Sequence, residues 1–335
     1  LWSITPYARY NELKLLPFWQ LSYNPEVWDT RNTSLGALAK VRYNADALHL
    51  KVIGGTDIDY SPGSQVSDGL SMETEGSPRA YLGYTVSSPH YNYDVTYRSV
   101  SPYLHAEYAP IPGLRLDGGI RYDAVGYSYA TKLAPVDTGV QRVPASQSVT
   151  YRHWSPKLGM TYDVTHDMNV YASYRHGFRA PSHSQLFQQG SAHNTVDLKP
   201  VQANSFEIGV RGMLHERVGY VISAYDMQIT NDILTYETAS NTREATNAGR
   251  TSHRGVETST SIMVARDFRI DAAYSVSRQR YVSWDPVAGT SYGGRRIEAA
   301  PASLGNVFAG YMPAFLNGGR MALELVTVGR YAMDP

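Results

Sequence analysis

The feature that most constrains this chain is a two-residue alternation of apolar and polar side chains that recurs along almost its whole length. In 114–123, leucine, isoleucine and tyrosine at even positions alternate with arginine and aspartate at odd positions, with glycine on both sides. Similar alternation recurs in 48–59, 168–175, 205–211 and 268–277. Successive side chains of a strand point to opposite faces, so each segment is predicted to be a β-strand with one apolar face.

About thirteen such strands can be placed from this pattern. They lie near 1–10, 34–43, 47–60, 99–109, 114–128, 150–162, 167–178, 201–212, 217–229, 253–264, 267–282, 303–312 and 319–331. Each covers about ten residues or more, whereas strands of soluble proteins usually have about five or six. About ten residues at a tilt of about 45° are enough to cross a bilayer.

The predicted connections between these strands alternate in length. Short turns are expected at 44–46, 110–113, 163–166, 213–216, 265–266 and 313–318. Long loops are expected near 11–33, 61–98, 129–149, 179–200, 230–252 and 283–302. Short turns at one end and long loops at the other are typical of outer-membrane barrels. The sequence therefore predicts an all-β fold, a transmembrane antiparallel β-barrel.

The face that meets lipid can be predicted from the cost of charge in a bilayer. An arginine or lysine that faces lipid at mid-depth costs about 2–4 kcal/mol. We therefore expect Arg115, Asp117, Arg121 and Asp123 to line a polar lumen, with the apolar residues outside. Open sheet edges in hydrocarbon leave backbone groups unpaired. Because both ends of the chain fall in or next to strands, we expect an internal fragment of a larger barrel.

Composition narrows the classes of function. Charged residues make up 18% of the chain, against roughly 25% in soluble domains. The 27 tyrosines suit membrane interfaces and polar ligand surfaces. Lys plus Arg and Asp plus Glu both total 30, which argues against a nucleic-acid partner. The sequence has no cysteine, no Gly-x-Ser-x-Gly elbow and no phosphate loop, so we predict that it is not an enzyme.

Aromatic and basic residues gather in the predicted loops. Aromatic rings with arginine can recognise an anionic, aromatic iron chelate by stacking and charge. An interfacial girdle and a mobile surface loop would explain the same composition. The candidate ligand-binding residues, all assigned to extracellular loops, are Arg79, Tyr81, Tyr84, Tyr91, Tyr93, Arg98, Arg179 and His183. His176, His183 and His193 lie near one another in sequence, but their spacing matches no metal template, so no metal site is predicted.

Several ordered motifs point to a known family. They are Thr5-Pro6-Tyr7-Ala8-Arg9-Tyr10, Gly177-Phe178-Arg179-Ala180-Pro181, Leu198-Lys199-Pro200, Glu207-Ile208-Gly209, Asn247-Ala248-Gly249 and Gly255-Val256-Glu257. In this order they resemble the barrel of TonB-dependent outer-membrane receptors. The first, together with Ser34-Leu35-Gly36 and Gly55-Thr56-Asp57-Ile58-Asp59-Tyr60, resembles members that carry ferric siderophores. The chain departs from the pattern at Val201, where the family usually has glutamate. Gly177 would let the chain leave its strand, and Pro181 would end the ladder.

The resemblance implies a barrel of about 22 strands around an N-terminal plug domain. Residues 1–335 would then be a partial barrel that lacks the plug and the terminal strands. Residues expected to face the lumen or the plug, from strand parity, are Arg121, Asp123, Arg175, Glu207, Arg211 and Glu257. They would pair with each other or with the plug, or contact substrate in transit.

The function implied is TonB-energised uptake of a ferric siderophore or similar chelate through the bacterial outer membrane. The chelate would be a transported ligand, and no cofactor is expected. The TonB complex would engage a missing N-terminal region, and the protein would be a monomer in outer-membrane lipid. Haem, cobalamin or an oligosaccharide are alternative substrates. A passive porin-like or structural barrel is the alternative function.

Overall fold

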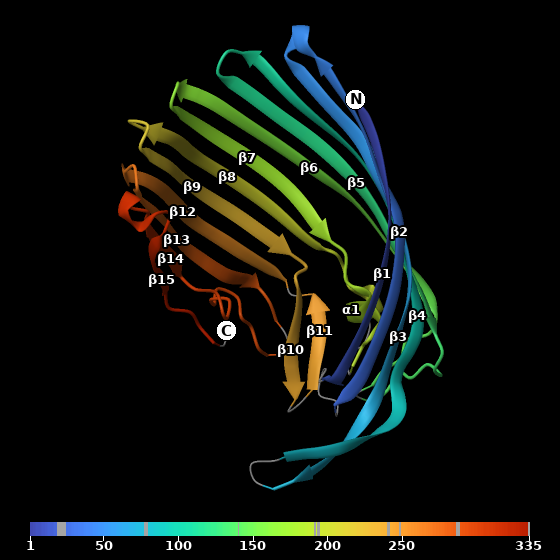
Figure 1. Cartoon of the computed structure of the whole chain (residues 1–335). Helices are drawn as coiled ribbons and strands as arrows, with labels where there is room; N and C mark the ends of the chain where they lie inside the picture. The colour runs from blue at the N-terminus through green and yellow to red at the C-terminus, as the bar shows by residue number, and fades with distance from the viewer. Residues whose placement is uncertain are drawn as a thin grey trace.

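The computed structural model describes residues 1–18, 25–76, 80–139, 141–190, 192, 195–239, 242–247, 249–285 and 289–333. One antiparallel sheet of thirteen strands curves into an open half barrel (Figure 1). In spatial order its strands are β1 (Trp2–Phe18), β2 (Glu26–Ala45), β3 (Leu50–Glu75), β4 (Ala80–Ile111), β5 (Leu114–Thr131), β6 (Gln147–Thr165), β7 (Met168–Arg179), β8 (Val201–Leu214), β9 (Val218–Thr230), β12 (Arg250–Ala265), β13 (Phe268–Ser283), β14 (Ser303–Tyr311) and β15 (Met321–Val328).

The remaining elements are short. A separate hairpin pairs β10 (Ile233–Ala239) with β11 (Thr242–Asn247). The helical turns are α1 (His183–Phe187), η1 (Asp46–Leu48), η2 (Thr195–Asp197) and η3 (Ala314–Leu316). None of the helices in the described part of the chain is long and apolar enough to cross a membrane.

The thirteen strands predicted from alternation are confirmed as the thirteen strands of the main sheet. Two of the predicted loops are wrong. The region 11–33 is largely occupied by the second half of β1 and the first half of β2. The region 61–98 is largely occupied by the second half of β3 and the first half of β4, which have 26 and 32 residues. Beyond the membrane-crossing part, both faces of a strand meet water, so the apolar–polar alternation fades while backbone pairing continues. The predicted loop 230–252 contains the β10–β11 hairpin.

The connections are sorted to the two ends of the sheet as the sequence predicts. Those from β2 to β3, β4 to β5 and each later alternate pair are short. The long ones, from β5 to β6, β7 to β8, β9 to β12 and β13 to β14, lie at the opposite end, which we call the loop end (Figure 1). The connections from β1 to β2 and from β3 to β4 also lie there but are short, because those strands extend further. Between β4 and β5 the turn contains Gly113 at φ 81°, a left-handed conformation that glycine adopts without steric cost. In outer-membrane barrels the long loops lie on the extracellular side.

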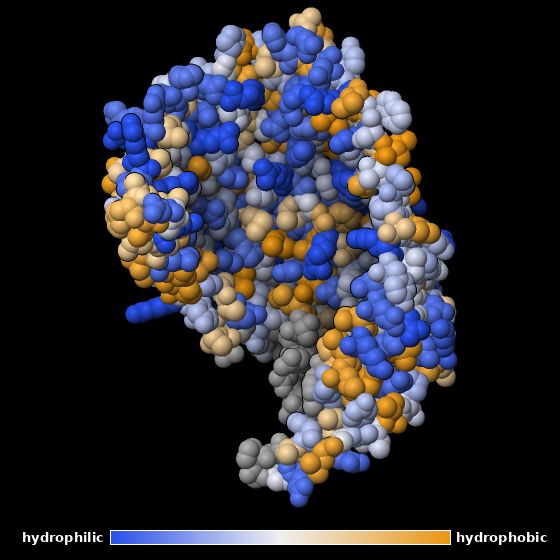
Figure 2. Space-filling view, in the orientation of Figure 1, coloured by the Kyte–Doolittle hydropathy of each residue, from blue (hydrophilic) through white to orange (hydrophobic). Residues whose placement is uncertain are grey.

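The charged face of β5 points into the hollow of the half barrel. The ring of Tyr129 stacks on Phe187 of the segment that contains α1, with centroids 4.2 Å apart, and α1 lies within the curve of the sheet (Figure 1). Because β5 pairs with β6 without a register shift from Leu114 to Tyr129, all odd positions share this inner face. The Arg115–Asp123 row therefore faces inward, as predicted, and hydrophilic residues cover much of the hollow side (Figure 2).

The outer face carries large apolar side chains with no protein cover. Leu104 of β4, Leu158 of β6 and Ile208 of β8 are 53%, 62% and 64% exposed. The register places all three at the outward positions of their strands. A belt of uncovered leucine and isoleucine is the surface expected to contact lipid.

Candidate functional site: the polar inner wall

An ion network on the inner wall joins β3 and β5 across β4. The Arg121 guanidinium of β5 donates to Asp57 of β3 at 2.6 Å and to Asp123 on its own strand at 2.8 Å. Asp123 is 9% exposed. The two carboxylates flank one guanidinium, which places a net negative charge of one on this part of the wall.

We predict that Arg121→Ala lowers the free energy of unfolding by about 1–2 kcal/mol, between the limits for exposed and buried pairs. The reason is that the largely buried Asp123 loses its cationic partner. Urea unfolding of the full-length protein measures this. The control is Arg115→Ala, whose partner Asp163 is 35% exposed, with an expected loss below about 1 kcal/mol. Equal losses in the two variants would contradict the prediction.

A second charged group lies toward the short-turn end. Lys51 Nζ lies 2.6 Å from Glu107 Oε2, and His105 Nε2 lies 3.6 Å from Glu107 Oε1. These residues, with Arg115 and Lys157 among others, line a hollow of about 920 Å³. Both signs of charge are present, so this surface can contact polar groups of either sign.

The third group contains the remaining predicted inner residues. Tyr171 donates its hydroxyl hydrogen to Glu207 at 3.0 Å, and the Arg211 guanidinium lies 5.6 Å from the Tyr171 ring centroid. Glu207 and Glu257 line one hollow of about 500 Å³. Arg175 lies opposite Lys157 in the sheet register.

All six residues predicted to face inward therefore lie on the inner face. Whether they contact a plug or a substrate stays a prediction.

The segment 181–200 folds inward and packs on the wall. Helix α1 begins with a capping box, in which the Ser182 side chain accepts from the Gln185 backbone and Gln185 reaches back to Ser182. Leu186 and Phe187 that follow are 0% exposed. They form one core with residues of β4, β5, β6 and β8. We call the described residues of 181–200 the inner segment.

Tyrosines of the wall hold the inner segment by hydrogen bonds. Tyr93 accepts from Gln188 Nε2 at 3.2 Å, Tyr91 accepts from the Gly190 amide at 3.1 Å, and Tyr151 donates to the Leu198 carbonyl at 3.0 Å. His183 Nδ1 lies 3.2 Å from the Tyr93 hydroxyl. Burial lowers the pKa of His183, so its imidazole is neutral at neutral pH. The inner segment is thus a fixed part of the loop end.

This packing corrects the predicted positions of the ligand-binding candidates. Tyr81, Tyr84, Tyr91, Tyr93 and Arg98 lie on strand β4 and not in a loop. Tyr91 and Tyr93 are 1% and 0% exposed beneath the inner segment, so they are closed to a ligand in this conformation.

The other candidates have mixed positions. Arg98 faces outward, 5.6 Å from the Tyr60 ring centroid. Arg179 ends β7 and is exposed, with Nη1 at 3.4 Å from Gln185 Oε1. Arg79 lies outside the described residues. Whether Tyr81, Tyr84 or Arg179 binds a ligand stays a prediction.

The end of β7 differs from the prediction at Gly177 and agrees with it at Pro181. β7 continues two residues past Gly177, to Arg179, and Gly177 has no positive φ, so its predicted role at the strand end is wrong. Pro181 does follow the strand end. No group of three or more potential metal ligands occurs among the described residues, and His193 lies outside them.

Residues 1–334 match the family model described as "TonB dependent receptor-like, beta-barrel". The chain belongs to this family. Among curated relatives, it is 32% identical over 135 residues to the vitamin B12 transporter BtuB of Vibrio vulnificus, covering 34% of this chain and 21% of that protein. It is 25% identical over 195 residues to the rhizobactin receptor of Rhizobium meliloti, covering 51% and 24%.

Solved structures show the same fold. The copper transporter OprC superposes with a TM-score of 0.70 at 14% identity, covering 93% of this chain and 48% of that one. The ferric yersiniabactin uptake receptor FyuA of Yersinia pestis superposes with a TM-score of 0.67 at 14% identity, covering 99% and 48%. The chain thus spans about a quarter of these curated relatives and about half of these solved chains.

Family membership confirms three predictions from the sequence. The chain is part of a TonB-dependent receptor β-barrel, its place is the bacterial outer membrane, and the family consists of transport receptors and not enzymes. Siderophore and iron-uptake receptors are among its relatives.

Proposed function

We propose that the full-length protein takes up a ferric siderophore or similar metal chelate by a TonB-energised step. The observation that carries this proposal is the inner segment, held against the wall by Phe187 and by hydrogen bonds to Tyr93 and Tyr151. A selective receptor gains affinity from a preorganised surface, because less conformational entropy is lost on binding.

The choice of a ferric chelate is supported by named relatives, which include a rhizobactin receptor, a ferric yersiniabactin uptake receptor and a siderophore receptor. The charged inner wall offers groups of both signs to a polar chelate along the passage. We propose that the TonB complex engages a region outside residues 1–335, that a plug domain fills the barrel, and that the protein works as a monomer without a cofactor.

The test is uptake of radioactive iron chelates by a deletion strain that carries the full-length gene. We expect saturable uptake of at least one ferric chelate, abolished when TonB is deleted. Uptake that stays linear with concentration and survives TonB deletion would favour a passive pore. If no ferric chelate is taken up but haem, vitamin B12 or an oligosaccharide is, the iron assignment is wrong and the transport mechanism stands.

A further inference from the structure

On the outer face, β4, β12 and β13 each change from an apolar side chain to an arginine toward the loop end. Val100 of β4 lies opposite Ala124 of β5, and Val256 of β12 lies opposite Val276 of β13. The next outward residue toward the loop end is Arg98 on β4, Arg254 on β12 and Arg278 on β13. This step marks the upper edge of the lipid band, where headgroups begin.

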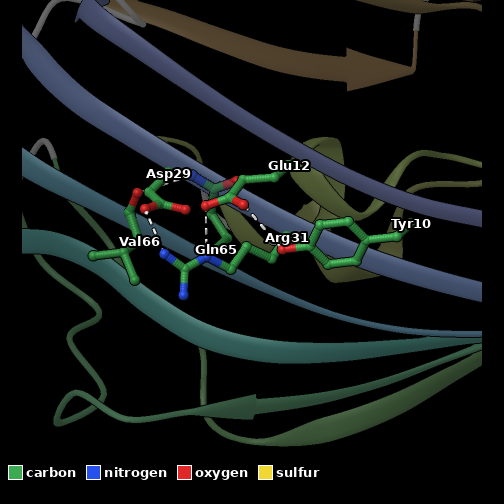
Figure 3. Close-up of polar contacts among 6 residues, drawn as sticks. All are labelled: Tyr10, Glu12, Asp29, Arg31, Gln65 and Val66. Carbon is green, nitrogen blue, oxygen red and sulfur yellow. Dashed lines mark hydrogen bonds and ion pairs between the residues drawn. The ribbon is translucent and has the colours of Figure 1, made fainter.

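Near the β1 edge, the charges in this zone are already compensated. Arg31 of β2 lies 3.2 Å from Glu12 of β1 and 3.3 Å from Asp29 (Figure 3). Tyr10 donates a further hydrogen bond to Glu12 at 3.0 Å (Figure 3). With Lys14 opposite Asp29 in the register, this part of the zone has two carboxylates for two cations, so its charges balance.

The outer face of β12 and β13 differs in charge. Arg254 lies directly opposite Arg278 in the register, and both are exposed, as is Arg250 two outward rows higher. Among the described outward residues of β9, β12 and β13 above the lipid band, Asp226 supplies the one carboxylate, 2.8 Å from Arg254. We call Arg250, Arg254 and Arg278 the arginine patch.

The arginine patch carries more positive than negative charge. Directly opposite residues have Cβ atoms about 4.5–5.5 Å apart, and like charges at that distance repel. One guanidinium carries five N–H donors, so Arg254 keeps free donors after its contact with Asp226. The nearby Arg280 donates to the Gly294 carbonyl at 3.0 Å and adds to the positive field. The described protein thus leaves this site with excess positive charge.

We propose that the arginine patch binds the phosphate groups of an anionic lipid headgroup in the outer leaflet. Guanidinium groups bind phosphate through paired, charge-assisted hydrogen bonds. The patch lies on the lipid-facing side, one row above the apolar band, where a phosphate attached to acyl chains is held in place by the membrane itself. A lipid phosphate is therefore a better match than a soluble anion.

The experiment uses full-length receptor in detergent and native mass spectrometry, with diphosphoryl lipid A as the probe. We expect the double variant Arg254→Gln/Arg278→Gln to bind this lipid at least about tenfold more weakly than the wild type does, because two charge-assisted contacts are lost. The matched control is Arg269→Gln on the same strand, whose side chain lies on the inner face beside Asp271. It should bind like the wild type.

Two comparisons decide between sources of the anion. Lipid A without phosphates should bind the wild type as weakly as diphosphoryl lipid A binds the double variant, and inorganic phosphate should compete only at much higher concentration. Unchanged lipid binding by the double variant would overturn the proposal. The proposal would also be overturned if the wild type bound phosphate-free lipid A as tightly as diphosphoryl lipid A. The same holds if Arg269→Gln weakened lipid binding as much as the double variant does. Heat-dependent gel mobility shows in each case that the barrel is folded.

Discussion

Replacing Phe187 by alanine releases the inner segment from the wall, because a fully enclosed ring that stacks on Tyr129 at 4.2 Å is lost. Truncation of a buried phenylalanine costs about 3–5 kcal/mol. Here the loss falls on the local opening of the inner segment and not on the sheet, whose backbone pairing does not involve Phe187.

Hydrogen exchange of the full-length protein measures this directly. We expect amides of the inner segment to exchange at least about a hundredfold faster in Phe187→Ala, while those of β5 and β6 keep their rates. Phe315→Ala is the matched control, since Phe315 lies in the connection between β14 and β15 and is 74% exposed. Unchanged protection of the inner segment in Phe187→Ala would show that it is not anchored through this ring.

Replacing Leu158 by arginine is the second change with a large expected effect. Leu158 is 62% exposed on the outer face of β6, and a lipid-facing arginine near mid-depth costs about 2–4 kcal/mol. Urea titration of the full-length protein in lipid vesicles measures the loss. Detergent is less suitable, because it lets a charged side chain reach water.

The control for Leu158→Arg is Ser173→Arg on the neighbouring strand. Ser173 lies opposite both Gly159 and Glu207 in the register, so its new guanidinium faces the inner wall and a carboxylate. We expect a loss below about 1 kcal/mol for this variant. If the two arginines were equally costly, the assignment of the two faces would be wrong.

Alternation predicted the membrane part of the fold because both environments are fixed there. Lipid on one side and water on the other force Leu116 and Arg121 of β5 to opposite faces, and the sequence records that choice. Beyond the lipid band, both faces of β4 meet water around Tyr81 and Tyr84, so the side chains there do not distinguish a long strand from a loop. Backbone hydrogen bonds, which leave no trace in side-chain composition, carry those strands onward.

The candidate site was predicted less well than the wall. Strand parity placed Arg121, Glu207 and Glu257 on the inner face because parity is a local property. It could not show that Tyr91 and Tyr93 lie beneath the inner segment, since that contact joins residues about a hundred positions apart. The adjacent apolar pair Leu186 and Phe187 in a polar stretch was the available signal for inward packing.

One face of each strand meets lipid, and the other lines a water-filled passage. The most direct test is spin-label accessibility along 154–162 of β6 in full-length protein in vesicles, aided by the absence of cysteine from this chain. We expect oxygen accessibility to peak at Trp154, Leu158 and Met160, and accessibility to a water-soluble nickel complex to peak at Ser155 and Lys157. Accessibility without a two-residue period, or with the phase reversed, would contradict the account.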